Sequence, residues 1–252
     1  MSVAARGPLW DRLFVSLLAG ALAACGVNRP AAAPRPVGLT IVDRPIPFPA
    51  ERVALTRAYI RAHYGRDVRN IRIVPRIIVL HWTGSESLEG DFRTFRPATL
   101  EGSRPELAGA GALNVSSHFL VDRDGTVYRL MPETWMARHV IGLNYNAIGI
   151  ENVGGAGGVP DLTQAQVDAD IALVRYLVHE HRTIHYLIGH HEYRVFEGHP
   201  LWLERQPGYR TDKLDPGPAF MAAVRAGVAD LRLKGPAKIQ QEGARAAAPV
   251  GS

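Results

Sequence analysis

Residues 76–81 read RIIVLH, and the architecture of the chain can be worked out from this segment. The run from Ile77 to Leu80 is apolar and rich in β-branched residues, as in a buried strand, and His81 follows it. Residues 184–190 read IHYLIGH and have the same design, because an apolar segment leads through Gly189 to His190. We therefore expect two strands, each of which delivers a histidine at its end.

The neighbouring segments predict more strands. Residues 118–121 and 126–131 alternate between apolar and polar side chains, and the turn DRDG at 122–125 joins them, so they predict a hairpin. Residues 147–153 predict a further strand, after which the glycines of 154–158 form a flexible linker or lip. These glycines lack the lysine and the helix that a phosphate-binding loop requires.

Helical patterns separate the predicted strands. Residues 53–63 predict a short helix closed by Gly65, and Thr163 with Gln166 forms a capping box that opens a helix to about residue 182. A last helix is expected between residues 216 and 231. The fold class that we predict is α/β, as a single domain with a central mixed β-sheet flanked by helices.

Composition excludes several classes of protein. The chain has 252 residues, of which 46% are hydrophobic, which suits one medium-sized domain with a core. Its formal net charge of +5 favours anionic surroundings without choosing among them. The arginines are scattered along the sequence, and neither a zinc-finger spacing nor an aromatic RNA-binding signature is present. We therefore expect no nucleic-acid partner.

The first 25 residues resemble a bacterial lipoprotein signal. Two arginines precede an apolar run at residues 13–24, which is too short to cross a bilayer comfortably. The run ends in LAACG at 22–26, where Cys25, the only cysteine in the chain, occupies the position that receives lipid. The alternative is a plain secretory signal with an incidental cysteine. Gly26 resembles the residue found after the cysteine in lipoproteins sorted to an outer membrane, so we expect the protein on the periplasmic face of that membrane.

These features predict four segments. Residues 1–24 are the signal peptide, 25–45 a Pro/Ala-rich linker, 46–231 the folded domain, and 232–252 a disordered tail. Since the chain has a single cysteine, it has no intramolecular disulfide. A lipid on Cys25 would make the membrane a partner through this anchor.

Three side chains offer themselves as metal ligands. His81 and His190 end the two apolar strands, and Asp215 stands next to a proline turn. Three nitrogen and oxygen ligands leave the fourth position of a zinc ion open, which is the arrangement of catalytic sites. The spacing alone is weak support, because the chain has 10 histidines and a histidine at a strand end is often only a polar edge residue.

Five segments, in this order, resemble the type 2 N-acetylmuramoyl-L-alanine amidases. They are IVLHWT (78–83), SHFLVDRDG (117–125), AIGIE (147–151), GH (189–190) and KLDPGP (213–218). The resemblance covers roughly residues 45 to 230 and extends to the structurally similar peptidoglycan recognition proteins. It implies that a Zn²⁺-dependent enzyme hydrolyses the amide between N-acetylmuramic acid and L-alanine in peptidoglycan or muropeptides, in wall turnover or recycling.

The resemblance also implies residue roles. It makes His81, His190 and Asp215 the zinc ligands at a cleft formed by the strand ends, and Glu151 the general base and acid. Lys213 is implied as the electrostatic stabiliser, and it is also the only lysine before residue 234.

His139 aligns roughly with a histidine near the family's substrate site, so a substrate contact is expected there. The alternative function is a recognition module that binds peptidoglycan without cutting it, although such relatives usually lack a ligand.

One region departs from the family. The connection between His190 and Lys213 has 22 residues, 191–212, and is rich in aromatics. It either lines the substrate groove or folds onto its own aromatic side chains. Because of this insertion His199 and Asp212 remain alternative third ligands, and His191 remains an alternative to His190. We expect a monomer, while the preference for intact wall or released fragments, the need for anhydro-muramic acid and the stem-peptide specificity stay open.

Overall fold

A computed structural model describes residues 38–100 and 109–247 of the chain, together with Met1. The predicted signal peptide beyond Met1, Cys25 and most of the predicted linker lie outside the described residues. Within the described part, no helix is both long and apolar enough to cross a membrane.

Six strands form one mixed sheet in the order β1-β4-β3-β5-β2-β6. Four of them, β3, β5, β2 and β6, run parallel, while β4 is antiparallel to β3 and parallel to β1. The strands are β1 (Ile41–Asp43), β2 (Ile77–Trp82), β3 (Phe119–Val121), β4 (Val127–Arg129), β5 (Ala147–Asn152) and β6 (Tyr186–Gly189). The mixed sheet is therefore confirmed, as is the hairpin of β3 and β4.

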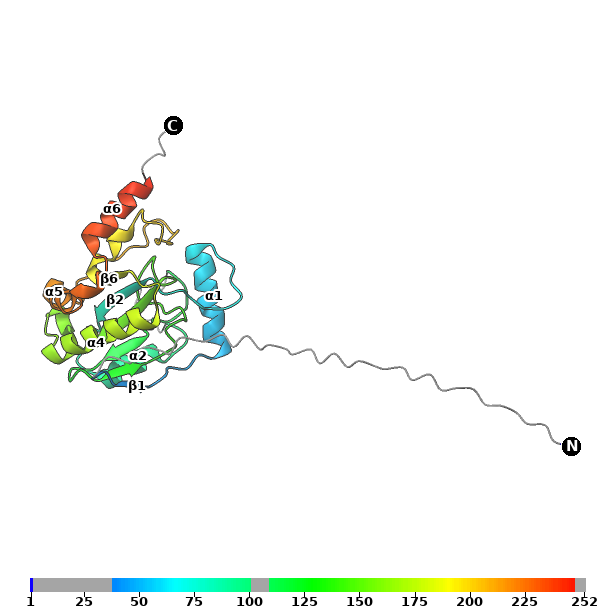
Figure 1. The fold of residues 1–252 in the computed structure, drawn as a ribbon, viewed down its shortest axis with the longest axis horizontal. Coiled ribbons are helices and arrows are strands. Elements are labelled where there is room, and N and C mark those ends of the chain that lie inside the picture. Colours follow the sequence, from blue (N-terminus) through cyan, green and yellow to red (C-terminus); the bar gives the residue numbers. More distant parts are fainter. Residues whose placement is uncertain (2–37, 101–108, 248–252) are drawn as a thin grey trace. The chain divides into compact units, whose positions relative to one another are not determined.

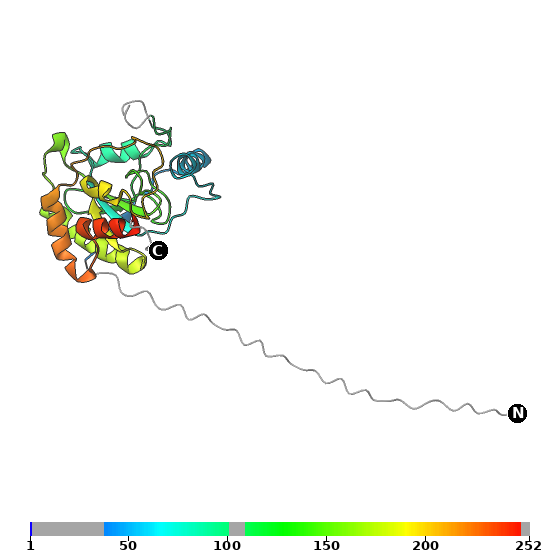
Figure 2. The ribbon, with the colours of Figure 1, turned by 90° about the horizontal axis from the view of Figure 1, so that it is seen from above.

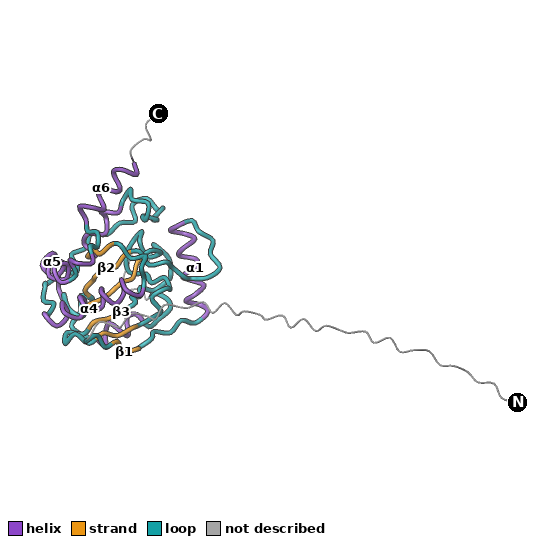
Figure 3. Tube along the Cα trace, viewed as in Figure 1, coloured by secondary structure: helices purple, strands orange, loops and turns teal. Residues whose placement is uncertain are grey.

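Helices surround the sheet, as Figure 1 and the tube in Figure 3 show. The α-helices are α1 (Ala50–Tyr64), α2 (Leu88–Phe95), α4 (Gln164–Glu180), α5 (Pro218–Gly227) and α6 (Pro236–Ala247), and the 3₁₀ turns are η1 (Ala156–Gly158), η2 (His190–Phe196) and η3 (Ala229–Leu231). One core layer joins one face of the sheet to α4 and α5. Seen from above, α2 lies on the opposite side of the sheet from α4 (Figure 2). This arrangement confirms an α/β domain with a sheet flanked by helices.

Alternation along the strands decides which side chains face the cleft. Ile78 and Leu80 of β2 point into the α4 and α5 layer, so His81 points to the other face with Val79. Glu151 of β5 pairs in register with His81 and shares its face. His190 follows β6 at a position that alternation assigns to the same face. The strands therefore present three polar side chains on one side of the sheet, at their carboxyl ends.

Two predicted helix caps are confirmed. Gly65 closes α1 in the left-handed conformation, with φ 62° and ψ 29°, and its N–H donates to the carbonyl of Arg61. Thr163 and Gln166 form the capping box of α4. The sequence pattern gave no indication of α2, which begins after the N-cap Ser87.

Two predicted boundaries are wrong. Residues 41–43 were assigned to the linker 25–45, but they form β1 and pair with β4, because the apolar side chain of Ile41 packs on the core. The tail 232–252 was predicted to be disordered, but residues 236–247 form α6, in which Ile239 is fully buried. In both cases one apolar side chain among many polar or small ones gives too weak a pattern to detect.

Candidate active site

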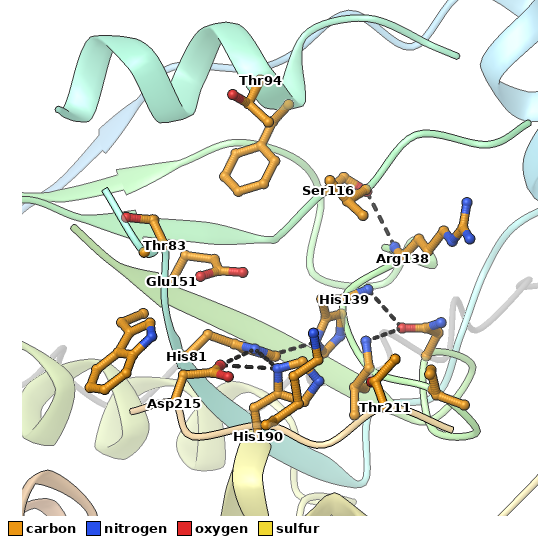
Figure 4. Close-up of a pocket in the computed structure, with 18 of the residues that line it drawn as sticks. His81, Thr83, Thr94, Ser116, Arg138, His139, Glu151, His190, Thr211 and Asp215 are labelled. Carbon is orange, nitrogen blue, oxygen red and sulfur yellow. Dashed lines mark hydrogen bonds and ion pairs between the residues drawn. The ribbon is translucent and has the colours of Figure 1, made fainter. Parts of the chain in front are cut away.

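Three ligand atoms converge beside the end of β2. His81 Nδ1 lies 3.0 Å from His190 Nδ1 and 3.2 Å from Asp215 Oδ2, and His190 Nδ1 lies 3.0 Å from the same carboxylate oxygen. All three residues are buried, and Figure 4 shows their side chains directed at one another. When the His, Cys, Asp and Glu side chains of the described residues are compared, these three are the group whose ligand atoms lie close enough together to hold a metal ion.

The triangle fits zinc. A tetrahedral zinc ion with bonds of about 2.0–2.1 Å to nitrogen and oxygen sets its ligand atoms roughly 3.3 Å apart, close to the three distances found. Two ring nitrogens that face each other at 3.0 Å, with a carboxylate oxygen completing the set, are the donors that Zn²⁺ prefers. The residues present therefore fit a zinc ion with His81, His190 and Asp215 as its protein ligands.

The protonation states also suit a metal. Burial lowers the pKa of His190 to about 4, so its ring is neutral at pH 7. Burial would raise the pKa of Asp215, but the neighbouring His190 and His81 rings hold it well below its usual range. A neutral imidazole and an ionised carboxylate are the forms that bind a metal without first losing a proton.

His139 contacts a ligand. Its Nδ1 lies 3.0 Å from His81 Nε2, the ring nitrogen that does not face the triad. Burial and the nearby His81 ring lower the pKa of His139 far below its usual range, so His139 is neutral and can accept this hydrogen bond. The backbone N–H of His139 donates to Asn144 Oδ1 at 2.8 Å, which fixes its loop. The structure thus places His139 where it orients His81, and its predicted contact with substrate stays a prediction.

Glu151 and Lys213 line the same cavity as the three ligands. The cavity has a volume of about 480 Å³. Glu151 projects into it on the far side of His81 from His190, as Figure 4 shows, and Lys213 comes from the segment that also carries Asp215. The strand-end geometry brings together all six residues that the sequence predicted for a catalytic, ligand or substrate role. Cys25, the predicted lipidation site, lies outside the described residues.

Several cavity residues were not found from the sequence. The walls include Thr94 of α2, Arg138, Asn144 and Thr211. Buried Arg138 is fixed by the carbonyl of Gly111 and by the hydroxyl of Tyr209. Arg138 directly precedes the predicted His139, which was the one signal available, whereas the others come from segments without a pattern of their own.

The insertion at 191–212 partly lines the cavity and partly packs on the protein. Tyr209 and Thr211 face the cavity, while Tyr193, Phe196 and Trp202 join the core layer under β2 and β6. Both sequence interpretations of this loop are therefore correct for different parts of it.

The alternative ligands lie elsewhere. His191 Nδ1 contacts the backbone carbonyl of Asp215 at 2.9 Å, and His199 lies near Tyr186 and Glu242. The side chain of Asp212 is 98% exposed, beside Arg194. None of the three joins the triangle of ligand atoms, which leaves Asp215 as the third ligand.

Comparison with protein families gives one match. The family model described as N-acetylmuramoyl-L-alanine amidase matches residues 71–218, which is more than half of the chain. This range contains β2 to β6, the three metal ligands, Glu151 and Lys213. None of the curated proteins matches the chain.

Solved structures give distant matches. The amidase LysC from Clostridium intestinale is 22% identical, with a TM-score of 0.45, over 77% of this chain and 99% of that chain. The endolysin of bacteriophage Ph2119 from Thermus scotoductus is 18% identical, with a TM-score of 0.41, over 77% and 100%. A human peptidoglycan recognition protein, solved with a glycosamyl muramyl pentapeptide, is 16% identical, with a TM-score of 0.43, over 64% and 88%.

Proposed function

The chain belongs to the N-acetylmuramoyl-L-alanine amidase family, and from this premise we propose that it works in cell-wall turnover or recycling outside the cytoplasm. Its reaction is hydrolysis of the amide between N-acetylmuramic acid and L-alanine, and its cofactor is Zn²⁺. The observation that carries the function is the buried triangle of His81, His190 and Asp215 in a cavity that Glu151 also lines. A module that only binds peptidoglycan has no need for a complete ligand set.

The residues around the cavity divide the chemistry among them. Zinc at the triad supplies Lewis-acid chemistry toward the amide carbonyl. Glu151 takes a proton from the attacking water as the C–O bond forms, and then delivers it to the nitrogen of the leaving L-alanine, so that the C–N bond breaks. The ammonium of Lys213 stabilises the negative charge that develops on the carbonyl oxygen. His139 holds the His81 ring in the orientation required by the triad.

The place of action follows from the amino terminus. A lipid on Cys25, after cleavage of residues 1–24, would anchor the protein, and the Pro/Ala-rich linker would hold the domain off the membrane. We expect the anchored monomer on the periplasmic face of an outer membrane. Cys25→Ser in the source organism should move the protein from the membrane fraction to the soluble periplasm. Membrane retention of the Cys25→Ser chain would contradict the lipid anchor.

The activity is tested on the mature chain, from residue 25 with Cys25→Ser, by digesting muropeptides and reading the products by mass. Free stem peptides that begin with L-alanine, together with peptide-free glycan, are expected with zinc and should vanish with a chelator. Glu151→Gln should keep the zinc and lose activity by about 10²–10⁴-fold. Lys213→Met should lose about 10²–10³-fold, since the oxyanion loses its cation. A zinc-loaded chain that binds muropeptides and leaves them intact would instead establish the recognition module.

A further inference from the structure

Exposed arginines gather around the amino ends of the parallel strands and the carboxyl end of α1. We name this group the basic pole, and it consists of Arg66, Arg69, Arg72, Arg76, Arg182 and Arg205. All six side chains are exposed, and among the described residues none of them forms an ion pair. Four of the six come from the connection between α1 and β2, at one side of the molecule in Figures 1 and 2.

Backbone contacts place these residues around the starts of the parallel strands. Arg76 directly precedes β2, its N–H donates to the carbonyl of Asn146 before β5, and its own carbonyl accepts from His185 before β6. The side chain of Thr183, next to Arg182, donates to Pro75 at 2.6 Å. Residues that are far apart in the sequence therefore meet here, which the scattered arginines of the sequence did not indicate.

The remaining arginines join the same end. The guanidinium carbon of Arg66 lies 5.4 Å from the centre of the Tyr145 ring. The backbone of Arg72 forms an isolated antiparallel β-bridge with that of Trp135. Arg205 passes close over Gly65, where an added Cβ would collide with its guanidinium. Arg69 lies between Arg66 and Arg72 in the connection.

The positive charge is not neutralised locally. The acidic residues nearby already have partners: Asp67 pairs with Arg61, Glu133 with Arg129, and buried Glu204 with His63. Glu180 contacts His179, and even if Glu133, Glu180 and Glu204 are all counted against the six arginines, three positive charges remain. Such a concentration creates a local potential that attracts anions.

The charges are spread over a surface and do not converge on a pocket. None of the six arginines lines the catalytic cavity or either of two further cavities, of about 500 and 300 Å³. A site for a small anion has side chains that point at a common centre. A set of positive charges that are separated from one another is instead suited to an extended anionic surface. Guanidinium groups bind phosphate oxygens in a bidentate manner, which suits phospholipid headgroups.

The position of the pole also selects the partner. The ligands lie at the carboxyl ends of β2 and β6, and Arg76 of the pole lies at the amino end of β2, about 20 Å away for the six residues of this strand. A glycan strand held in the cavity therefore lies at the other end of β2 from Arg76. We infer that the basic pole binds the surface of an anionic phospholipid membrane and holds the catalytic cavity facing away from it.

The proposed lipid anchor would join the domain away from the pole, because β1 runs antiparallel to β2 and its first residue, Ile41, is level with the carboxyl end of β5. The 13 residues from Cys25 to the first residue of the described domain, Gly38, span at most about 40 Å as an extended spacer. A spacer of this length would leave the pole free to reach the bilayer, so the contact rests on the charge of the pole. The binding itself does not depend on the anchor, and it can be measured without it.

Vesicle sedimentation tests the inference with the mature chain that carries Cys25→Ser. We expect binding to vesicles that contain phosphatidylglycerol and none to phosphatidylcholine vesicles, with a strong loss at high salt. The pole variant, Arg66→Gln, Arg69→Gln, Arg72→Gln and Arg76→Gln together, should bind at least tenfold more weakly. The matched control replaces four exposed cations elsewhere, as Arg93→Gln, Arg96→Gln, Lys238→Gln and Arg245→Gln. It removes the same charge and should stay within about twofold of the parent.

Three results would overturn the inference: no binding to anionic vesicles, equal weakening in the control variant, or pole-dependent binding to isolated wall in place of vesicles. Muropeptide cleavage, unchanged in the pole variant, shows that this variant is folded. If every variant lacks amidase activity while vesicle binding follows the pole, the proposed function fails and this inference stands.

Discussion

His81 has a different partner at each of its ring nitrogens. Nδ1 belongs to the triangle of ligand atoms, and Nε2 lies 3.0 Å from His139. A ligand histidine whose second nitrogen is held by a neighbour keeps one tautomer and one ring orientation. His139 in turn packs over Gly149, the residue two places before Glu151 on the same face of β5. The absence of a side chain at position 149 is therefore a condition of the metal site.

Gly149→Ala tests this dependence. A Cβ at position 149 would lie 2.7 Å from His139 Cγ and Nδ1, so the His139 ring must move away from His81. We expect zinc affinity to fall by about 10–100-fold in a competition titration, with a parallel loss of activity at limiting zinc. Gly109→Ala is the matched control, because a Cβ there meets nothing within 4 Å. An unchanged zinc affinity in Gly149→Ala would show that His139 does not position His81.

At this scale the sequence predicted the ligands but not their surroundings. His81 and His190 could be predicted because each ends an apolar strand, and the aspartate of the KLDPGP segment completes the family pattern. The contact between His139 and His81, and the support of its loop by Asn144, depend on how a loop folds back over the sheet. No periodicity records such a contact, so it could not be predicted.

Among the elements, α1 and the insertion 191–212 are joined by a buried hydrogen bond between side chains. His63 of α1 lies 2.9 Å from Glu204, and both side chains are 1% exposed or less. The N–H of Arg205 donates to the carbonyl of His63, and the ring of His63 lies beside Tyr209, which lines the cavity. The pair therefore connects a peripheral helix to one wall of the active site.

A double-mutant cycle measures this connection. His63→Ala or Glu204→Ala leaves a buried polar partner uncompensated, and we expect each to lower the free energy of unfolding by about 3–5 kcal/mol. The double variant should lose less than the sum, with a coupling above about 1 kcal/mol in urea unfolding. Arg61 and Asp67, an exposed pair at the end of the same helix, are the control and should couple by less than about 0.5 kcal/mol. Additive losses would mean that the two side chains stabilise the fold independently.

A second connection links α4 to β2 through β5. Asn152 donates both to the carbonyl of His81 and to the carboxylate of Asp170, at 3.1 Å in each case. Asp170 is fully buried, and burial raises its pKa to about 7. The folded protein therefore keeps a proton on Asp170 at pH values where the unfolded chain has already lost it.

This shift predicts a pH dependence. Below about pH 4 both states hold the proton, and between about pH 4 and 7 only the folded state does, so the contribution of Asp170 to the free energy of unfolding falls as pH rises through that window. Asp170→Asn removes the titration and should become more stable than the parent as pH rises, by an amount on the order of a few kcal/mol by pH 8. Urea unfolding at pH 5 and 8 measures the difference. Asp168→Asn, at an exposed position of α4, should lack this slope, and a pH-independent difference for Asp170→Asn would refute the argument.

For the whole molecule, the sequence predicted the middle of the domain better than its limits. The long apolar strands β2, β5 and β6 and the capped helix α4 each have a strong local pattern, and they form the centre of the fold. β1 has only three residues and forms through its pairing with β4. The burial of Ile239 in α6 requires a surface built by η2 and β6, so local composition could not reveal it.

The extent of the domain can be tested by truncation. A chain that ends at Gly235 loses α6, and with it the buried Ile239 and the two contacts of Glu242, with Lys234 at 2.7 Å and Tyr186 at 2.9 Å. Burial of one isoleucine contributes about 2–3 kcal/mol, so Tm should fall by roughly 5–10 °C in a domain of this size. A chain that ends at Ala247 keeps α6 and should have the same Tm as the full-length protein. Equal Tm values for the two truncated chains would mean that α6 adds nothing to the fold, whereas the expected gap makes residues 236–247 part of the catalytic domain.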